Sequence, residues 1–132
     1  MSDTLDVRDL INLPFKPHGR DREGFDCWGL AMEVNRRMGI RLPDYAYGED
    51  MEVTLLHKLV SGNKDLIVEL DRPEPYCLVG FSIIPGYETH IGTVLGDCRR
   101  FIHIRRRQRV IISRLNDIVW RRRVRGFYRW IG

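Results

Sequence analysis

The chain has 132 residues, of which 43% are hydrophobic and 30% are charged, a balance typical of one globular domain with a real core. No apolar run is long enough to span a membrane, and the N-terminus lacks the form of a signal peptide, so we expect synthesis in the cytoplasm. The three cysteines have no metal-type spacing, which argues against a disulfide framework and a zinc site. Residues 1–132 are therefore expected to form a single domain.

The net charge of +4 conceals two segments of opposite sign. Residues 1–98 carry ten Lys or Arg and seventeen Asp or Glu, whereas residues 99–132 carry twelve Arg and one Asp. The first segment thus has a net charge of −7 and the second a net charge of +11. An Arg-rich segment from about residue 99 predicts an anionic partner, such as nucleic acid, an acidic protein surface or a polyanionic envelope. Folding back onto the acidic part of the same chain explains the pattern equally well.

Helical patterns dominate the first half of the chain. A short helix is expected within residues 2–11, and a longer one from Cys27 to Met38, closed by Gly39 in a left-handed conformation. Residues 52–60 predict a further helix, because apolar side chains recur there on one side.

The second half changes to short apolar runs separated by turns, which predicts strands. Ser113 falls in one of these runs and is also suited to cap a short helical turn that ends at Trp120. Helices followed by consecutive strands predict an α+β fold, with N-terminal helices packed on a mainly antiparallel sheet. The expected strands are residues 66–70, 77–84, 90–95, 101–104, 110–115 and 124–131.

Residues 24–30, Gly-Phe-Asp-Cys-Trp-Gly-Leu, place Cys27 at the first turn of the longer helix, with Asp26 as its cap. The unpaired N–H groups and positive dipole end of a helix stabilise an anion, so a thiol at this position ionises more readily. Gly24 and Gly29 allow backbone or ligand to approach closely. Cys27 is a candidate nucleophile, although free cysteines are also commonly small buried apolar residues.

Two histidines complete a candidate catalytic site. His90 opens the strand 90–95 and His103 lies in the strand 101–104, and antiparallel neighbours can bring both side chains onto one face. A catalytic thiol needs a base, and the base needs a polar group that orients its ring. Cys27, His90 and His103 supply these three roles in chain order. Taken singly, a histidine in such a position is more often a structural or surface residue than a functional one.

These motifs together resemble the NlpC/P60 family of papain-like cysteine peptidases, from Leu13 to Trp130. Family members show an Asp-Cys-small-Gly helix start, a His-apolar-Gly strand and a Phe-apolar-His strand. The resemblance implies that Cys27 is the nucleophile, His90 the general base and acid, and His103 the orienting residue, with no metal or cofactor.

The substrate that the resemblance implies is the stem peptide of bacterial peptidoglycan. Phe15 occupies the position where family members often carry a Tyr that helps to bind the oxyanion, and losing one such donor costs roughly 10²–10³ in rate. The residues expected to contact substrate are Phe15, His18, Asp26, Trp28, Tyr45 and Tyr47.

Trp28 and the ending at residues 119–129 resemble the phage tail-tip branch of the family. This implies a hydrolase made in the bacterial cytoplasm, carried in the virion tail and delivered to the periplasm. The alternative is a structural tail-tip protein that cleaves little and docks on other tail-tip or hub proteins. A nucleic-acid binder is a third interpretation, which we do not favour because Arg alternating with apolar residues also fits a half-exposed strand. The arginines expected at the docking surface are Arg99, Arg105, Arg106, Arg107, Arg121, Arg122 and Arg123.

Overall fold

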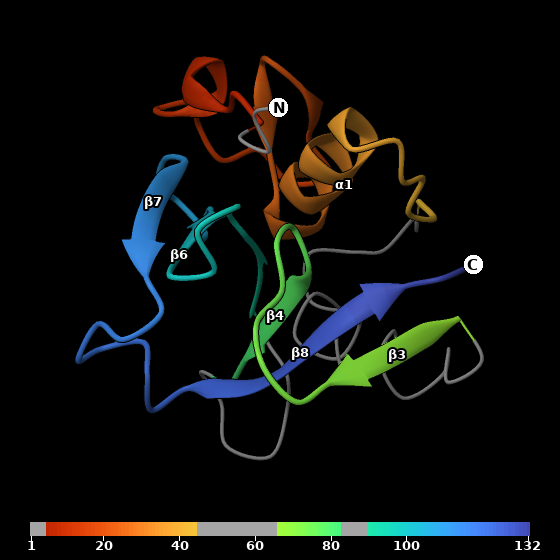
Figure 1. Cartoon of the computed structure of the whole chain (residues 1–132). Helices are drawn as coiled ribbons and strands as arrows, with labels where there is room; N and C mark the ends of the chain where they lie inside the picture. The colour runs from red at the N-terminus through yellow and green to blue at the C-terminus, as the bar shows by residue number, and fades with distance from the viewer. Residues whose placement is uncertain (1–4, 45–65, 83–89) are drawn as a thin grey trace.

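The computed structural model describes residues 5–44, 66–82 and 90–132. These residues form one α-helix, a short 3-10 helix and eight strands (Figure 1). In chain order the elements are η1 (Arg8–Leu10), β1 (Arg20–Asp21), β2 (Gly24–Phe25), α1 (Cys27–Arg37), β3 (Ile67–Leu70), β4 (Leu78–Phe81), β5 (His90–Val94), β6 (Arg100–His103), β7 (Ile111–Arg114) and β8 (Val124–Trp130).

Helix α1 begins and ends close to the predicted positions. Its cap is Asp26, whose Oδ1 accepts a hydrogen bond from the backbone N–H of Gly29 at 2.6 Å. The last helical residue is Arg37, and Gly39 has the predicted left-handed conformation, with φ of 80°. Leu30, Ala31 and Val34 are buried side chains of this helix, and local signals stabilise both of its ends.

Six strands form one antiparallel sheet in the order β3-β8-β4-β5-β6-β7. Strand β8, the last in the sequence, lies between β3 and β4 (Figure 1). Each of the six predicted strand segments corresponds to one of these strands, with ends that differ by at most three residues. The mainly antiparallel sheet of the α+β prediction is confirmed.

The two faces of this sheet have different partners. Helix α1 packs on the face that carries Leu78, Ile91 and Ile102, and the buried side chains there form two apolar clusters. The opposite face carries Phe81 and Phe101, with Trp120 packed against both rings. Because strand side chains alternate, neighbours along β5 and β6 belong to different faces.

Three details differ from the sequence-based expectations. The helix expected within residues 2–11 is reduced to the three residues of η1 in the described part of the chain. The hairpin of β1 and β2 was not predicted, because each strand has only two residues. The segment before Trp120 forms hydrogen-bonded turns instead of a helical turn, and Ser113 lies within β7. The helix expected over residues 52–60 lies outside the described residues.

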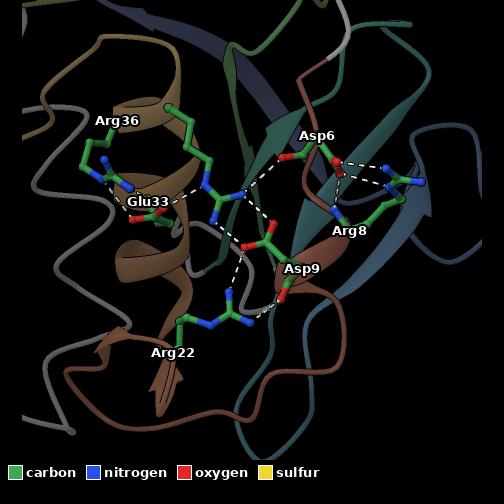
Figure 2. Close-up of polar contacts among 7 residues, drawn as sticks. Asp6, Arg8, Asp9, Arg22, Glu33 and Arg36 are labelled. Atoms are coloured by element: carbon green, nitrogen blue, oxygen red, sulfur yellow. Dashed lines mark hydrogen bonds and ion pairs between the residues drawn. The ribbon is translucent and has the colours of Figure 1, made fainter.

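A network of ion pairs fastens η1 to α1 (Figure 2). Arg37 donates to the carboxylate of Asp9 with two bonds of 2.7 Å and to Glu33 at 2.8 Å, while Arg22 donates to Asp9 at 2.7 Å. The hydrogen bonds from Arg37 hold the pKa of Asp9 well below its usual value. Part of the negative charge of the N-terminal segment is thus neutralised by arginines of that same segment, including Arg37 of α1.

Among the described helices, none has the length and apolar character required to cross a bilayer.

Candidate active site

Two buried histidines from adjacent strands are joined by a hydrogen bond. Nε2 of His90 on β5 lies 2.8 Å from Nδ1 of His103 on β6, and the two residues are 3% and 1% exposed. The other ring nitrogen of His103, Nε2, lies 2.8 Å from Oγ of Ser113 on β7. The row of hydrogen-bonded polar groups thus runs across three neighbouring strands, β5, β6 and β7.

The protonation state of this chain follows from its burial. Burial lowers the pKa of His90 well below 6.5, and the positive charges of His103 and Arg105 act in the same direction. Burial also lowers the pKa of His103 to about 3, with a further contribution from Arg105. Both rings are therefore neutral at neutral pH, and each carries one N–H.

With both histidines neutral, the hydrogens of these two hydrogen bonds can point in only two ways, toward Ser113 or toward His90. If His90 donates from Nε2 to His103, then His103 must donate from its own Nε2 to Oγ of Ser113, and Nδ1 of His90 is left able to accept a proton. In the opposite direction, Ser113 donates and Nδ1 of His90 carries the hydrogen. Only the first arrangement makes His90 a base on the side away from His103.

Aromatic rings enclose the histidine pair. Trp120 stacks on His90 with centroids 5.4 Å apart and meets His103 edge-on at 4.9 Å. The ring centroids of Phe101 and His103 are 4.3 Å apart, and the guanidinium carbon of Arg105 lies 5.7 Å from the ring centroid of Trp120. The histidine rings are therefore fixed in orientation and shielded from water, which accounts for their lowered pKa values.

Cys27 is the first residue of α1 and is 3% exposed. It belongs to the same buried cluster as Ile91, on the face of the sheet that α1 covers. Alternation along β5 turns His90 to the other face, where its ring lies beside Phe81. The structure thus brings the two predicted histidines together and places the predicted thiol at the start of the helix that packs on the opposite face of their sheet.

Gly29 explains how the chain approaches the start of α1. A Cβ atom at this position would lie 2.0 Å from the backbone oxygen of Gly19. The loop before the helix can therefore pack against its first turn only because Gly29 has no side chain. The prediction that this glycine permits a close backbone approach is confirmed.

The other residues expected to contact substrate lie in different environments. Asp26 is buried, caps α1 and pairs with Arg20 at 2.8 Å, while Trp28 is buried in the core and donates from Nε1 to the backbone oxygen of Pro43 at 2.9 Å. These contacts of Asp26 and Trp28 stabilise the fold. Phe15 is half-buried against an apolar cluster, and His18 is exposed. Tyr45 and Tyr47 lie outside the described residues.

Among the described residues, no group of three His, Cys, Asp or Glu side chains could hold a metal ion.

Ser113 belongs to this site, but its role there was not predicted from the sequence. Its suitability as a helix cap competed with its place in a predicted strand. In the structure Ser113 pairs with Phe101, one residue before Ile102 and two before His103. Alternation along the two strands places Ser113 and His103 on one face, and this signal could have identified the contact.

The fold and site together define an α+β domain with a cysteine at a helix start and a buried histidine pair on the sheet. The sequence model of the NlpC/P60 family matches residues 12–129, and the chain belongs to that family. No curated protein matches the chain.

Solved structures show the same fold. An NLP/P60 family protein similar to a lipoprotein, from Staphylococcus aureus, has a TM-score of 0.64 at 21% identity over 98% of this chain and 43% of its own. An NlpC/P60 family protein from Bacillus cereus has a TM-score of 0.64 at 22% identity over 98% of this chain and 41% of its own. The NlpC/p60 domain of the peptidoglycan hydrolase SagA has a TM-score of 0.59 at 16% identity, over 89% of this chain and 87% of that domain. The chain thus spans about two fifths of the first two proteins.

Proposed function

We propose that the chain is a thiol peptidase that cleaves peptide bonds in bacterial cell-wall stem peptides. The observation that carries the proposal is the hydrogen-bonded chain from His90 through His103 to Ser113, on the sheet against which the helix of Cys27 packs. Membership of the NlpC/P60 family supports the class of enzyme, because its members are typically cysteine peptidases or amidases. The likeness to SagA supports the class of substrate, because SagA is a peptidoglycan hydrolase.

In this proposal Cys27 is the nucleophile and His90 the general base. Nδ1 of His90 accepts the thiol proton as sulfur attacks the peptide carbonyl, and the same proton then passes to the leaving amine. Water hydrolyses the acyl-enzyme and regenerates the thiol. The backbone N–H of Cys27 at the start of α1 is a donor for the oxyanion, in place of the Tyr hydroxyl that Phe15 lacks.

The lowered pKa of His90 bears on the order of proton transfer. A preformed thiolate–imidazolium pair requires a charged His90, which burial disfavours. We therefore propose that the proton moves during the attack of sulfur on the carbonyl. His103 holds the ring of His90 by its hydrogen bond and does not itself take up the proton, because its own pKa is about 3.

Peptide cleavage tests the assignment directly. The purified chain is incubated with a synthetic stem peptide and with muropeptides, and the products are identified by liquid chromatography and mass spectrometry. Cys27→Ala and His90→Ala are expected to abolish cleavage, whereas Arg122→Gln, at an exposed position outside the proposed site, is a control that retains it. Cleavage that persists in Cys27→Ala would show that another group is the nucleophile.

The pairing of Cys27 with His90 has a separate test. The rate of alkylation of Cys27 is measured against pH by peptide-resolved mass spectrometry, in the wild type and in His90→Gln. A histidine that accepts the proton during attack lets the neutral thiol react, so the wild type is alkylated at lower pH than the variant. Identical profiles would exclude His90 as the partner of the thiol and favour a structural role for the domain.

We also propose that the protein acts in a phage or prophage-derived tail tip, made in the cytoplasm and delivered to the periplasm with the virion. The support is the likeness of Trp28 and of residues 119–129 to the phage branch of the family. Mass spectrometry of purified particles tests this role. Particles that lack the chain, while the producing cells contain it, would contradict the proposal.

The structural alternative, docking through the Arg-rich segment, has an observation of its own. Arg99, Arg121 and Arg122 are exposed, and within the described residues none of their side chains has an ion pair. Arg105 and Arg123 differ, because both contact Trp120 beside the histidine pair. If docking is the main function, replacing the three exposed arginines abolishes incorporation into particles, while Cys27→Ala leaves particle infectivity unchanged.

A further inference from the structure

A cavity that is separate from the histidine pair is lined by arginines. It has a volume of about 750 Å³ and lies where the start of β6 meets the end of β7, next to β8. None of Cys27, His90 and His103 contributes to its lining. A cavity of this size matches those that enclose small organic ligands, and it exceeds the needs of a single inorganic ion.

The charge of this cavity is strongly positive. Four arginines and one aspartate line it, a formal net charge of +3, and the arginines are Arg99, Arg100, Arg114 and Arg121. Asp97 offsets only Arg100: its Oδ2 accepts from Nε of Arg100 at 2.7 Å, and its Oδ1 accepts from two backbone N–H groups at 3.0 Å. Burial alone would raise the pKa of Asp97, but these hydrogen bonds lower it overall, so Asp97 stays ionised.

The other three guanidinium groups have no such partner. In the part of the chain that the structure describes, the side chains of Arg99, Arg114 and Arg121 form no ion pair or hydrogen bond. Moreover, Arg100 and Arg114 stand directly opposite each other in the β6–β7 pair. Like charges opposite each other destabilise a sheet, and Asp97 offsets only the charge of Arg100, so an anion beside Arg114 would relieve the repulsion that remains.

We propose that this cavity binds a small organic ligand that carries phosphate groups. One phosphate group has a charge of about −1.5 to −2 and several acceptor oxygens, which suits two or three guanidinium groups around one centre. A single carboxylate would be matched by one arginine fork and would leave the others unneutralised. Leu115 and Phe127 also line the cavity and offer an apolar surface to the uncharged part of the ligand.

Cys98 provides a native reporter for this site. It lines the same cavity, is partly exposed and is not in a disulfide. A ligand in the cavity is therefore expected to slow alkylation of Cys98. Cys77 serves as an internal reference in the same digest, because it is buried and outside the cavity lining.

The experiment measures alkylation of Cys98 in the full chain against the concentration of inorganic pyrophosphate at constant ionic strength. Saturable protection is expected, and Arg114→Gln and Arg121→Gln should each weaken it about tenfold, the effect of losing one charge-assisted contact. Arg122→Gln is the matched control, because it removes an equal charge from an exposed arginine outside the cavity and should leave protection unchanged.

Three outcomes would overturn the proposal. Protection that fails to saturate indicates general screening by salt. Equal weakening in Arg122→Gln indicates a diffuse effect of net charge. Equal protection by citrate at matched charge would show that the cavity does not select phosphates over carboxylates. Because the readout is protection of Cys98, it is independent of whether the chain cleaves peptides.

Discussion

Oγ of Ser113 lies 2.8 Å from Nε2 of His103, so the buried histidine pair ends on a hydroxyl group. This contact allows His103 to donate outward, and in that arrangement Nδ1 of His90 carries no hydrogen, the state that a general base requires. Ser113 is in this sense a positioning residue that acts through His103. Its removal should change the tautomers of the histidines as well as the stability of the domain.

We expect Ser113→Ala to lower kcat about tenfold with little change in KM, because the unpartnered His103 no longer fixes the ring of His90. Stability should fall by about 1–2 kcal/mol, since a buried ring nitrogen loses its partner. Ser113→Thr retains the hydroxyl and should restore the wild-type ¹⁵N shifts of both histidine rings. A normal kcat in Ser113→Ala, with unchanged ring shifts, would reduce the serine to a packing residue.

Acid should destabilise the domain between about pH 6.5 and pH 3. The folded-state pKa values of His90 and His103 are lowered, so the unfolded chain binds protons in this range that the folded chain does not. The stability that the neutral pair contributes is complete above pH 6.5 and is lost as pH falls, by about 1.4 kcal/mol per pH unit for each histidine. Urea unfolding at a series of pH values measures the slope.

The variants that test this slope are His103→Gln and Asn116→Ala. The first should flatten the pH dependence, because one lowered pKa is removed, and the second changes an exposed side chain that does not titrate and should leave it unchanged. An equal slope in all three proteins would mean that other groups cause the loss of stability in acid.

Gly29→Ala should destabilise the domain by about 3 kcal/mol, at the upper end of overpacking effects. The reason is steric, because the added Cβ would lie 2.0 Å from the backbone oxygen of Gly19. Gly39→Ala is the control: its Cβ would meet no atom within 4 Å, so only the left-handed φ contributes, at about 1 kcal/mol. Thermal unfolding compares the two, and similar losses in both would rule out the steric explanation.

Asp9→Asn should cost about 1 kcal/mol, because it breaks two ion pairs that are partly exposed and therefore screened. Arg37 would retain Glu33, which limits the loss. Since the pKa of Asp9 is lowered in the folded state, its contribution is present above about pH 4 and is lost on further acidification. Unfolding at high and low salt checks the assignment, because a salt-independent effect would not be electrostatic.

Thr93→Val should stabilise the domain by about 1 kcal/mol. Oγ1 of Thr93 is buried without a hydrogen-bond partner among the described residues, and Thr93 lies opposite Leu78 and Ile102 in the sheet. Replacing the hydroxyl by a methyl group removes an unsatisfied polar group at nearly constant shape. Thr93→Ala removes the same hydroxyl but leaves a gap, so it should not stabilise. Denaturant unfolding that shows a loss in Thr93→Val would point to a polar partner at this site.

The sequence was most informative where local signals and periodicity agree. Helix α1 was predicted because Asp26 and Gly39 mark its ends, and the strands because apolar runs alternate with turns. The histidine pair was predicted from strand order, which depends only on the turn between β5 and β6. Ser113 was missed as a partner because its contact depends on the register of β7, which one sequence does not fix.

Charge was harder to interpret than fold. The predicted docking surface treated the arginines from residue 99 as one group. In the structure they have separate environments: Arg105 and Arg123 contact Trp120, while Arg99 and Arg121 line the cavity with Arg114. This division depends on tertiary neighbours, and no pattern in the sequence distinguishes one arginine from another.

The position of β8 has a consequence for biosynthesis. Strands β3 and β4 are close in sequence, yet their shared neighbour is translated more than forty residues after β4 begins. Until β8 emerges from the ribosome, both strands present unpaired edges, the kind of surface that promotes aggregation. Ribosome-stalled fragments that end before Val124 should therefore be prone to self-association, and adding the β8 sequence as a separate peptide should suppress it.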